Sequence, residues 1–179
     1  SPLSNITVES IGRQLTLGTT QTDVNGNFSI ISLDSDNATF DVGFNIEGHS
    51  NSNLSSIVYQ YNSRGDGEFV LGDVVLKPVA TFNLSIEKTN PDTERLQWNL
   101  RYEDANCELV FGDDEDTVTE CDGGGEDFDF LNINNPNFER SYRTILNSEA
   151  VFTYRIDDNE PQTIQISISE NQTNYVFEY

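Results

Sequence analysis

The strongest constraint on the fold of this 179-residue chain is an apolar residue at every second position, repeated in one short run after another. Successive side chains of a strand point to opposite faces, so each run makes one apolar face and one polar face. Turn-rich clusters separate the runs, which favours antiparallel sheets over βαβ units. The clearest runs are 40–46, 82–86, 96–102, 152–156, 164–168 and 175–179. The pattern predicts an all-β protein.

The chain is long enough for one large β-sandwich or for two of about 80 to 100 residues each. Hydrophobic residues make up only 35% of it, but eleven Phe, seven Tyr and one Trp supply bulky side chains for a core. A boundary is expected at Lys77–Ala80, where Pro78 ends a strand by removing a hydrogen-bond donor and Thr81 begins a new run. We therefore predict two tandem antiparallel β-sandwiches, residues 1–78 and residues 79–179.

The first of these segments contains a distinctive turn, Asp23–Asn27, whose Asn-Gly pair favours the positive φ of tight hairpins. Alternating residues flank it, and Leu71–Lys77 has the pattern of a closing strand stopped by proline. Together these pieces resemble the carboxypeptidase regulatory-like domain, a small transthyretin-like β-sandwich common on bacterial cell surfaces. The resemblance covers about residues 1–78. It implies no peptidase activity, because catalysis in that family belongs to a separate zinc domain.

The second segment, 79–179, resembles no family that we can name. Its strand spacing fits an immunoglobulin-like or jelly-roll sandwich. One stretch departs from the β pattern: Phe138, Tyr142 and Ile145 follow Asn-Asn-Pro-Asn at helical spacing. We expect a short helix there.

The formal net charge of −22 is unevenly distributed and excludes several classes of partner. Residues 1–78 carry nine acids and three bases, and residues 79–179 carry twenty-two acids and six bases. A field of this sign repels phosphate backbones and anionic lipid headgroups, so we expect no nucleic-acid binding. No apolar run is long enough for a membrane span. Such acidity is typical of a solvated surface in an extracellular medium, and divalent-cation capture is the alternative.

The acidity is most concentrated in residues 103–129, which hold twelve carboxylates and no Lys or Arg. Crowded carboxylates repel one another unless they are solvated, protonated or neutralised by a cation. Ca²⁺ takes six to eight oxygen ligands, which Gly- and Asp-rich loops supply, although no EF-hand spacing is present. A solvated acidic loop is the favoured interpretation, and calcium binding is the alternative. The candidate metal ligands are Asp113, Asp114, Asp116, Asp122, Asp127 and Asp129.

Cys107 and Cys121 are the only cysteines, with thirteen residues between them. In a chain of secreted type they favour one disulfide, which would contribute about 3 kcal/mol to stability. Two unpaired thiols are the alternative. The disulfide would tie the base of the acidic loop and bring its two Asp clusters together.

Catalysis finds little support in the sequence. One histidine, His49, has no recognisable nucleophile near it, and no phosphate-binding or zinc motif occurs. Paired carboxylates could hydrolyse glycosides, but nothing sets two of them apart as acid and base. Trp98 could stack on sugars, yet its phase with Leu96 and Leu100 favours the core. We expect no enzyme.

The expected function is that of a non-catalytic bacterial module, secreted or displayed on the cell surface, and a membrane-anchored lipoprotein would fit. It would act as a scaffold or as a binding module for a cell-surface protein or polysaccharide. The alternatives are a calcium-dependent adhesion module that binds carbohydrate or protein and, with less support, a glycoside hydrolase or its accessory domain.

Overall fold

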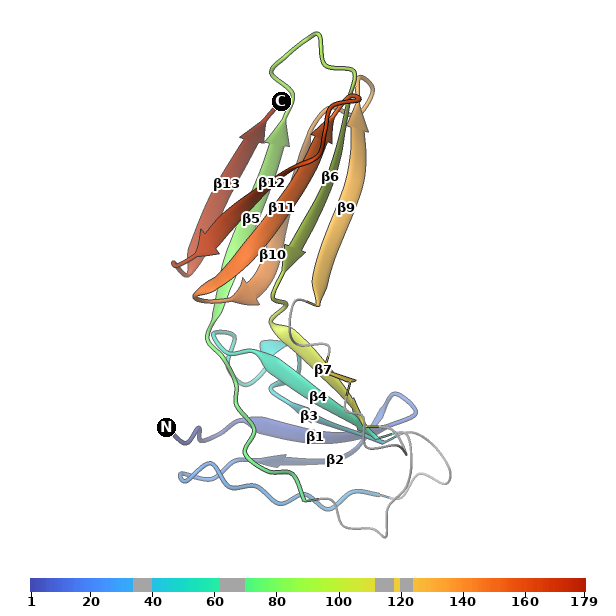
Figure 1. Cartoon of the computed structure of the whole chain (residues 1–179). Coiled ribbons are helices and arrows are strands. Elements are labelled where there is room, and N and C mark those ends of the chain that lie inside the picture. Colours follow the sequence, from blue (N-terminus) through green and yellow to red (C-terminus); the bar gives the residue numbers. More distant parts are fainter. Residues whose placement is uncertain (34–39, 62–69, 112–117, 120–123) are drawn as a thin grey trace. The chain divides into compact units, whose positions relative to one another are not determined.

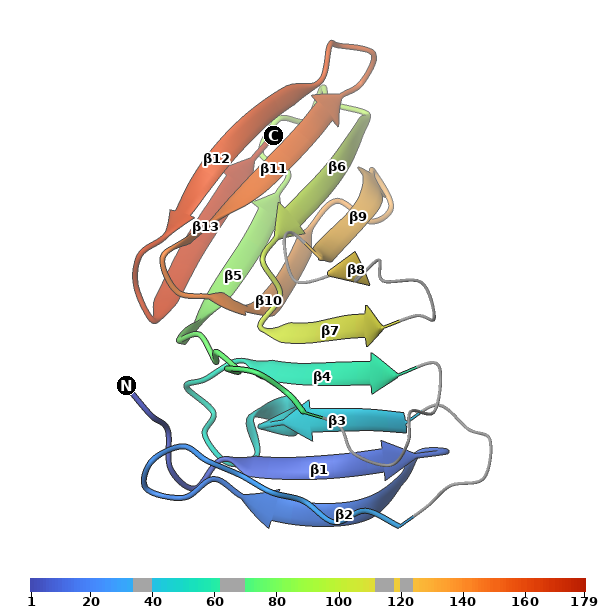
Figure 2. The same cartoon turned by 60° about the horizontal axis from the view of Figure 1, so that its bottom comes forward.

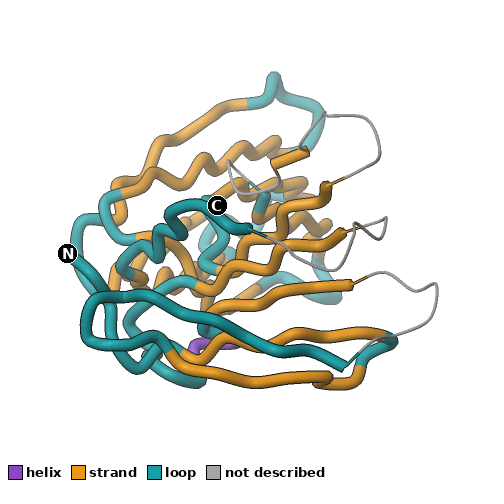
Figure 3. The backbone as a smooth tube through the Cα atoms, turned by 90° about the horizontal axis from the view of Figure 1, so that it is seen from below, coloured by secondary structure: helices purple, strands orange, loops and turns teal. Residues whose placement is uncertain are grey.

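The computed structural model describes the backbone of residues 1–33, 40–61, 70–111, 118–119 and 124–179 (Figure 1). Within these ranges the protein is all-β, as predicted. Strands and loops make up the described backbone apart from one short 3-10 helix, η1 (Ile46–Gly48) (Figure 3).

The chain divides into two compact units, and the first boundary falls between Lys77 and Pro78. Unit 1 comprises Ser1–Lys77 and Asn106–Cys121, and unit 2 comprises Pro78–Ala105 and Asp122–Tyr179. The expectation of one uninterrupted segment 79–179 therefore differs from the structure. The segment Asn106–Cys121 belongs to unit 1 because its first strand pairs with a strand of that unit.

Unit 1 is built on a six-stranded sheet with the strand order β2-β1-β3-β4-β7-β8 (Figure 2). Most neighbouring strands are antiparallel, but β4 and β7 run parallel, with Ser56 opposite Asn106. The sheet is thus mixed, which corrects the expectation of purely antiparallel pairing. The strands are β1 (Thr7–Gly12), β2 (Leu15–Gln21), β3 (Phe40–Phe44), β4 (Ser56–Tyr61), β7 (Asn106–Phe111) and β8 (Val118–Thr119).

Unit 1 has a small core on one face of this sheet. Val8, Val42 and Phe44 are buried there, and Phe28 packs edge-on against Phe44 with ring centroids 5.0 Å apart. In place of a second sheet, the described loop segments before β3 and before β5 supply the covering side chains. These partly buried side chains include Phe28, Leu71, Val74 and Leu76. The expectation of a closing strand at Leu71–Lys77 is wrong, because this segment forms no strand.

The turn predicted at Asp23–Asn27 is confirmed, but the hairpin expected around it is wrong, because residues 28–33 form no strand. The Asp23 carboxylate accepts hydrogen bonds from the backbone N–H groups of Asn25 (2.8 Å) and Asn27 (2.9 Å), and Gly26 has a φ of 78°. Its hydrogen bonds to Asn27 and Asn25 lower the pKa of Asp23. The turn leads from β2 into a loop segment, whereas the β1–β2 hairpin turns at Arg13 and Gln14, which both have positive φ.

Unit 2 is a β-sandwich of a three-stranded sheet, β10-β5-β13, and a four-stranded sheet, β12-β11-β6-β9 (Figure 1). All its neighbouring strands are antiparallel except β13, which runs parallel to β5. The strands are β5 (Val79–Glu87), β6 (Arg95–Tyr102), β9 (Gly125–Asn132), β10 (Phe138–Ile145), β11 (Ser148–Ile156), β12 (Gln162–Ile168) and β13 (Gln172–Glu178).

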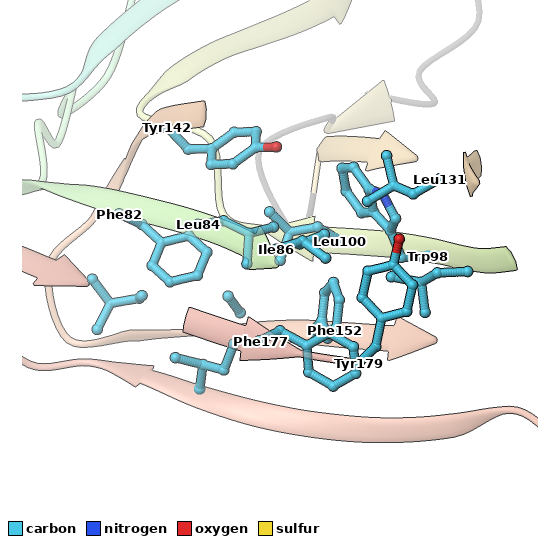
Figure 4. Packing of buried hydrophobic residues seen from close by; sticks show 14 of the residues in the cluster. Phe82, Leu84, Ile86, Trp98, Leu100, Leu131, Tyr142, Phe152, Phe177 and Tyr179 are labelled. Carbon is cyan, nitrogen blue, oxygen red and sulfur yellow. The ribbon is translucent and has the colours of Figure 1, made fainter. Parts of the chain in front are cut away.

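The core of unit 2 joins the inner faces of the two sheets (Figure 4). Phe152 on β11 is fully buried and packs against Phe177 on β13, with ring centroids 5.0 Å apart. Trp98 on β6 packs against Phe138 on β10 at 4.6 Å. Trp98 is only 3% exposed, so the prediction that it belongs to the core is confirmed.

The helix expected after Asn-Asn-Pro-Asn is wrong, because Phe138–Ile145 forms strand β10 and pairs with β5 along its whole length. Phe138 and Tyr142 are four positions apart, and this spacing puts two side chains on one face of either a helix or a strand. The residues between Phe138 and Tyr142 distinguish a helix from a strand. Arg140 shares their face as a strand residue and reaches over the Tyr142 ring, with its guanidinium carbon 5.6 Å from the ring centroid.

Candidate functional site

Four of the six predicted metal ligands, Asp113, Asp114, Asp116 and Asp122, lie outside the described residues, and their role in calcium binding stays a prediction. Cys121 lies outside them too. Cys107 is on β7 and is 9% exposed. Because Cys121 lies outside the described residues, the Cys107–Cys121 disulfide also stays a prediction.

Asp127 lies on β9 and bridges the two sheets of unit 2. Its Oδ2 atom accepts hydrogen bonds from the Tyr142 hydroxyl (2.7 Å) and from Arg140 Nη1 (2.9 Å), both on β10. Its side chain is 20% exposed, whereas that of Arg140 is 59% exposed. Burial, followed by the hydrogen bond to Asp127, raises the pKa of the Tyr142 hydroxyl well above its usual range. In this structure Asp127 is therefore a structural link between the sheets.

Asp129 makes a different contact. Its Oδ1 atom accepts a hydrogen bond from the backbone N–H of Phe130 at 2.7 Å. No group of three or more His, Cys, Asp or Glu side chains that could hold a metal ion occurs in the part of the chain that the structure describes. Asp127 and Asp129 thus do not form a calcium site by themselves, and such a site would need ligands from the acidic segment before them.

The calcium prediction is testable by calorimetric titration of the purified chain. If the acidic segment binds Ca²⁺, the isotherm should show saturable heat at millimolar calcium, and EDTA should lower the melting temperature. Mg²⁺ is the matched control, because its small size and octahedral geometry make flexible all-protein sites a poor fit. A flat calcium isotherm would contradict the prediction.

Strand β9 sets Asp127 and Asp129 on the side of the sheet that faces the core, although Asp129 remains exposed, whereas Glu126 points outward. Its register with β6 sets Asp127 opposite Leu100 and Asp129 opposite Trp98, and both partners are core residues. Asp127 is accommodated because Tyr142 and Arg140 satisfy its carboxylate. Acidic side chains on the inner face are unusual, since such positions normally hold apolar residues.

The ends of β9 complete this packing. Leu131 is fully buried, and at Gly125 an added Cβ would lie 2.5 Å from the Tyr102 ring, so only glycine fits without a shift. Tyr102 in turn packs on Tyr142 with ring centroids 4.9 Å apart. These contacts hold β9 in a register that sends its even-numbered residues outward.

Two phenylalanines occupy that outward side. Phe128 lies opposite Asn99 and is 67% exposed, and Phe130 lies opposite Gln97 and is 58% exposed. A shift of one residue would turn both rings toward the core and would turn the largely buried Asp127 toward water. The structure instead exposes two large apolar rings on adjacent outward positions of an edge strand.

The polar side chains beside these rings form a bonded group. Glu126 Oε1 accepts hydrogen bonds from Asn99 Nδ2 (2.6 Å) and from Arg101 Nε (3.1 Å). These bonds lower the pKa of Glu126, with the bond from Asn99 the larger cause. We call the outward residues of the two strands the β6–β9 face. Its members are Gln97, Asn99, Arg101, Glu126, Phe128 and Phe130.

Sequence reasoning missed the β6–β9 face because it treated residues 103–129 as one acidic loop. The signal was present in Asp-Phe-Asp-Phe, an alternation that indicates a strand. Which side faces inward could not be inferred from it, since the partners of Asp127 lie on another strand.

The chain matches no protein-family model, no curated protein and no solved structure. None of the described helices is long and apolar enough to cross a membrane. The site must therefore be interpreted from its own geometry.

Proposed function

We propose that this protein is a non-catalytic module, secreted or displayed on a bacterial cell surface, that binds a ligand on the β6–β9 face. The observation that carries the proposal is the outward placement of Phe128 and Phe130. Burying a Phe side chain stabilises a fold by about 1.5–3 kcal/mol relative to leaving it exposed. A strand that exposes two of them loses that contribution, and exposed apolar patches mark interaction sites.

The rest of unit 2 supports a binding role. The β6–β9 face lies on a sheet backed by a densely aromatic core, in which Trp98, Phe138 and Phe152 pack together. A rigid sheet holds surface side chains in place before a ligand arrives, which lowers the entropic cost of binding. The module can therefore present this face without rearrangement.

The proposed extracellular location is inferred from the sequence. The resemblance of residues 1–78 to the carboxypeptidase regulatory-like domain supports it, as does the net charge of −22, which keeps a protein soluble and disfavours nucleic-acid partners. A lipoprotein anchored in the outer membrane is compatible with both.

An NMR titration of the ¹⁵N-labelled chain tests the proposed function. A mixed panel of soluble oligosaccharides and extended peptides is added, and backbone amide shifts are followed. We expect saturable shifts concentrated on β6 and β9. Shifts confined to other strands, or no shifts with any member of the panel, would contradict the proposal.

A further inference from the structure

We propose that the ligand of the β6–β9 face is an uncharged polysaccharide chain. This inference rests on the proposed function and names the class of ligand that the face takes. Four features of the structure lead to it: a partly occupied strand edge, arginines that are already bonded, neighbouring aromatic and amide groups, and an open sheet face.

The edge of β9 is poorly suited to an added peptide strand. A peptide that extends a sheet needs the outward backbone N–H and C=O groups of the edge strand. The N–H of Phe130 already donates to Asp129, and Asn132 and Asn135 bond each other in both directions through their backbones at 3.1 Å. Acidic side chains along the strand also repel an acidic partner. The ligand must therefore be recognised by the side chains of the face.

Two arginines on this side of the sheet are paired with acidic side chains, although the chain as a whole is strongly acidic. Arg101 pairs with Glu126, and Arg95 at the start of β6 pairs with Asp158. The register brings a third arginine, Arg155 on β11, opposite Gln97, and its Nε donates to the backbone carbonyl of Asn159 at 2.9 Å. Arginines that are already bonded offer little attraction to an anion, which the net charge of −22 also repels. An uncharged ligand is the complement of such a surface.

The chemical groups of the face match those of a sugar chain. The Phe128 and Phe130 rings offer apolar area for the C–H faces of pyranose rings. The amides of Gln97 and Asn99 both donate and accept hydrogen bonds, as sugar hydroxyls do. The neighbouring strands add hydroxyls, since Thr153 and Thr163 lie 3.2 Å apart through their Oγ1 atoms on the same outward side.

The surface is a sheet face, and it spans several strands. Strands lie about 4.8 Å apart, so the distance from β9 to β12 across the sheet is roughly 14 Å. An extended polymer can contact that width at several points, whereas a small molecule would find no enclosing walls. Such an open surface predicts weak binding, with a dissociation constant of roughly 0.1–1 mM, that is raised by repetition along a polymer.

Affinity electrophoresis of the full chain tests the inference. The gels contain cellulose derivatives without charge, mixed-linkage β-glucan, xylan, mannan or soluble starch, with a polyuronate as the charged comparison. We expect retardation by at least one uncharged polymer, unchanged by EDTA. The double variant Phe128→Ser/Phe130→Ser should weaken retardation about tenfold or more, since aromatic contacts at the centre of a binding surface carry most of its affinity.

The matched control is Val176→Ser, because Val176 is 54% exposed on β13, which belongs to the other sheet. It should leave retardation unchanged. Retardation by the polyuronate alone, or by no polymer, overturns the inference. In either case NMR shifts on β6 and β9 with an extended peptide would leave the proposed function standing, and their absence would remove both. If Val176→Ser and the double variant lose retardation equally, the inference is also overturned.

Discussion

Phe152→Ala is expected to lower the free energy of unfolding of unit 2 by about 3–5 kcal/mol, the usual cost of emptying a buried Phe site. Phe152 is fully buried, and its ring packs against those of Trp98, Tyr154 and Phe177. Domains of this size are stable by only 5–15 kcal/mol, so one substitution would remove a large share of that stability.

The measurement is urea unfolding followed by Trp98 fluorescence. Trp98 is the only tryptophan of the chain and is buried in unit 2, so its signal reports that unit separately from unit 1. Phe128→Ala is the control, because the same residue type at an exposed position should change stability by less than about 0.5 kcal/mol. Similar effects of the two substitutions would contradict the core described for unit 2.

Asp127→Ala is expected to destabilise unit 2 by about 2–3 kcal/mol. It removes the acceptor of two hydrogen bonds and leaves the part-buried Tyr142 hydroxyl without its partner. The expected loss is smaller than for a fully buried ion pair, because Arg140 is more than half exposed and can be hydrated. Asp127→Asn keeps an acceptor and should cost less. A change below 0.5 kcal/mol for Asp127→Ala would show that the bridge contributes nothing.

The same bridge predicts alkaline sensitivity. The pKa of Tyr142 is raised in the folded state, so its stabilising effect is present below the ordinary tyrosine value of 10.0 and is lost as the pH rises above it. Burial raises the pKa of Tyr102 beside it in the same direction. The free energy of unfolding should therefore fall between pH 9 and 11, and this fall should be smaller in Asp127→Ala, which removes part of the shift.

The alternating pattern was sufficient to predict the all-β fold and many of its core residues. In runs such as Phe82–Ile86 and Leu96–Leu100, the apolar side chains avoid water and therefore face inward. The apolar residues of both runs lie in the core of unit 2. The turn at Asp23–Asn27 was also predictable, because the Asp23 carboxylate accepts hydrogen bonds from the backbone N–H groups two and four residues later in the chain. Local chemistry determines each of these features.

Features that depend on distant partners could not be predicted in this way. The parallel pairing of β4 with β7 joins residues fifty positions apart, and nothing in either strand's own pattern specifies it. The inward side of β9 depends on Tyr142 and Arg140, which stabilise a carboxylate at a position where a short pattern favours an apolar residue. Because Asp127 faces inward, Phe128 and Phe130 face outward and form the candidate site. The site could therefore be recognised only from the folded structure.

Because β7 lies in the chain between two segments of unit 2 yet belongs to the sheet of unit 1, neither unit can be excised with a single cut. Truncation after Lys77, the boundary that the sequence suggests, would strip β4 of its neighbour and leave Ser56–Tyr61 as a bare edge. A fragment of residues 78–179 would contain β7 without β4, the strand with which β7 pairs. The chain must therefore finish its first sheet only after the second unit has begun to emerge from the ribosome, and fragment-based studies should splice out residues 106–121 rather than simply shorten the chain.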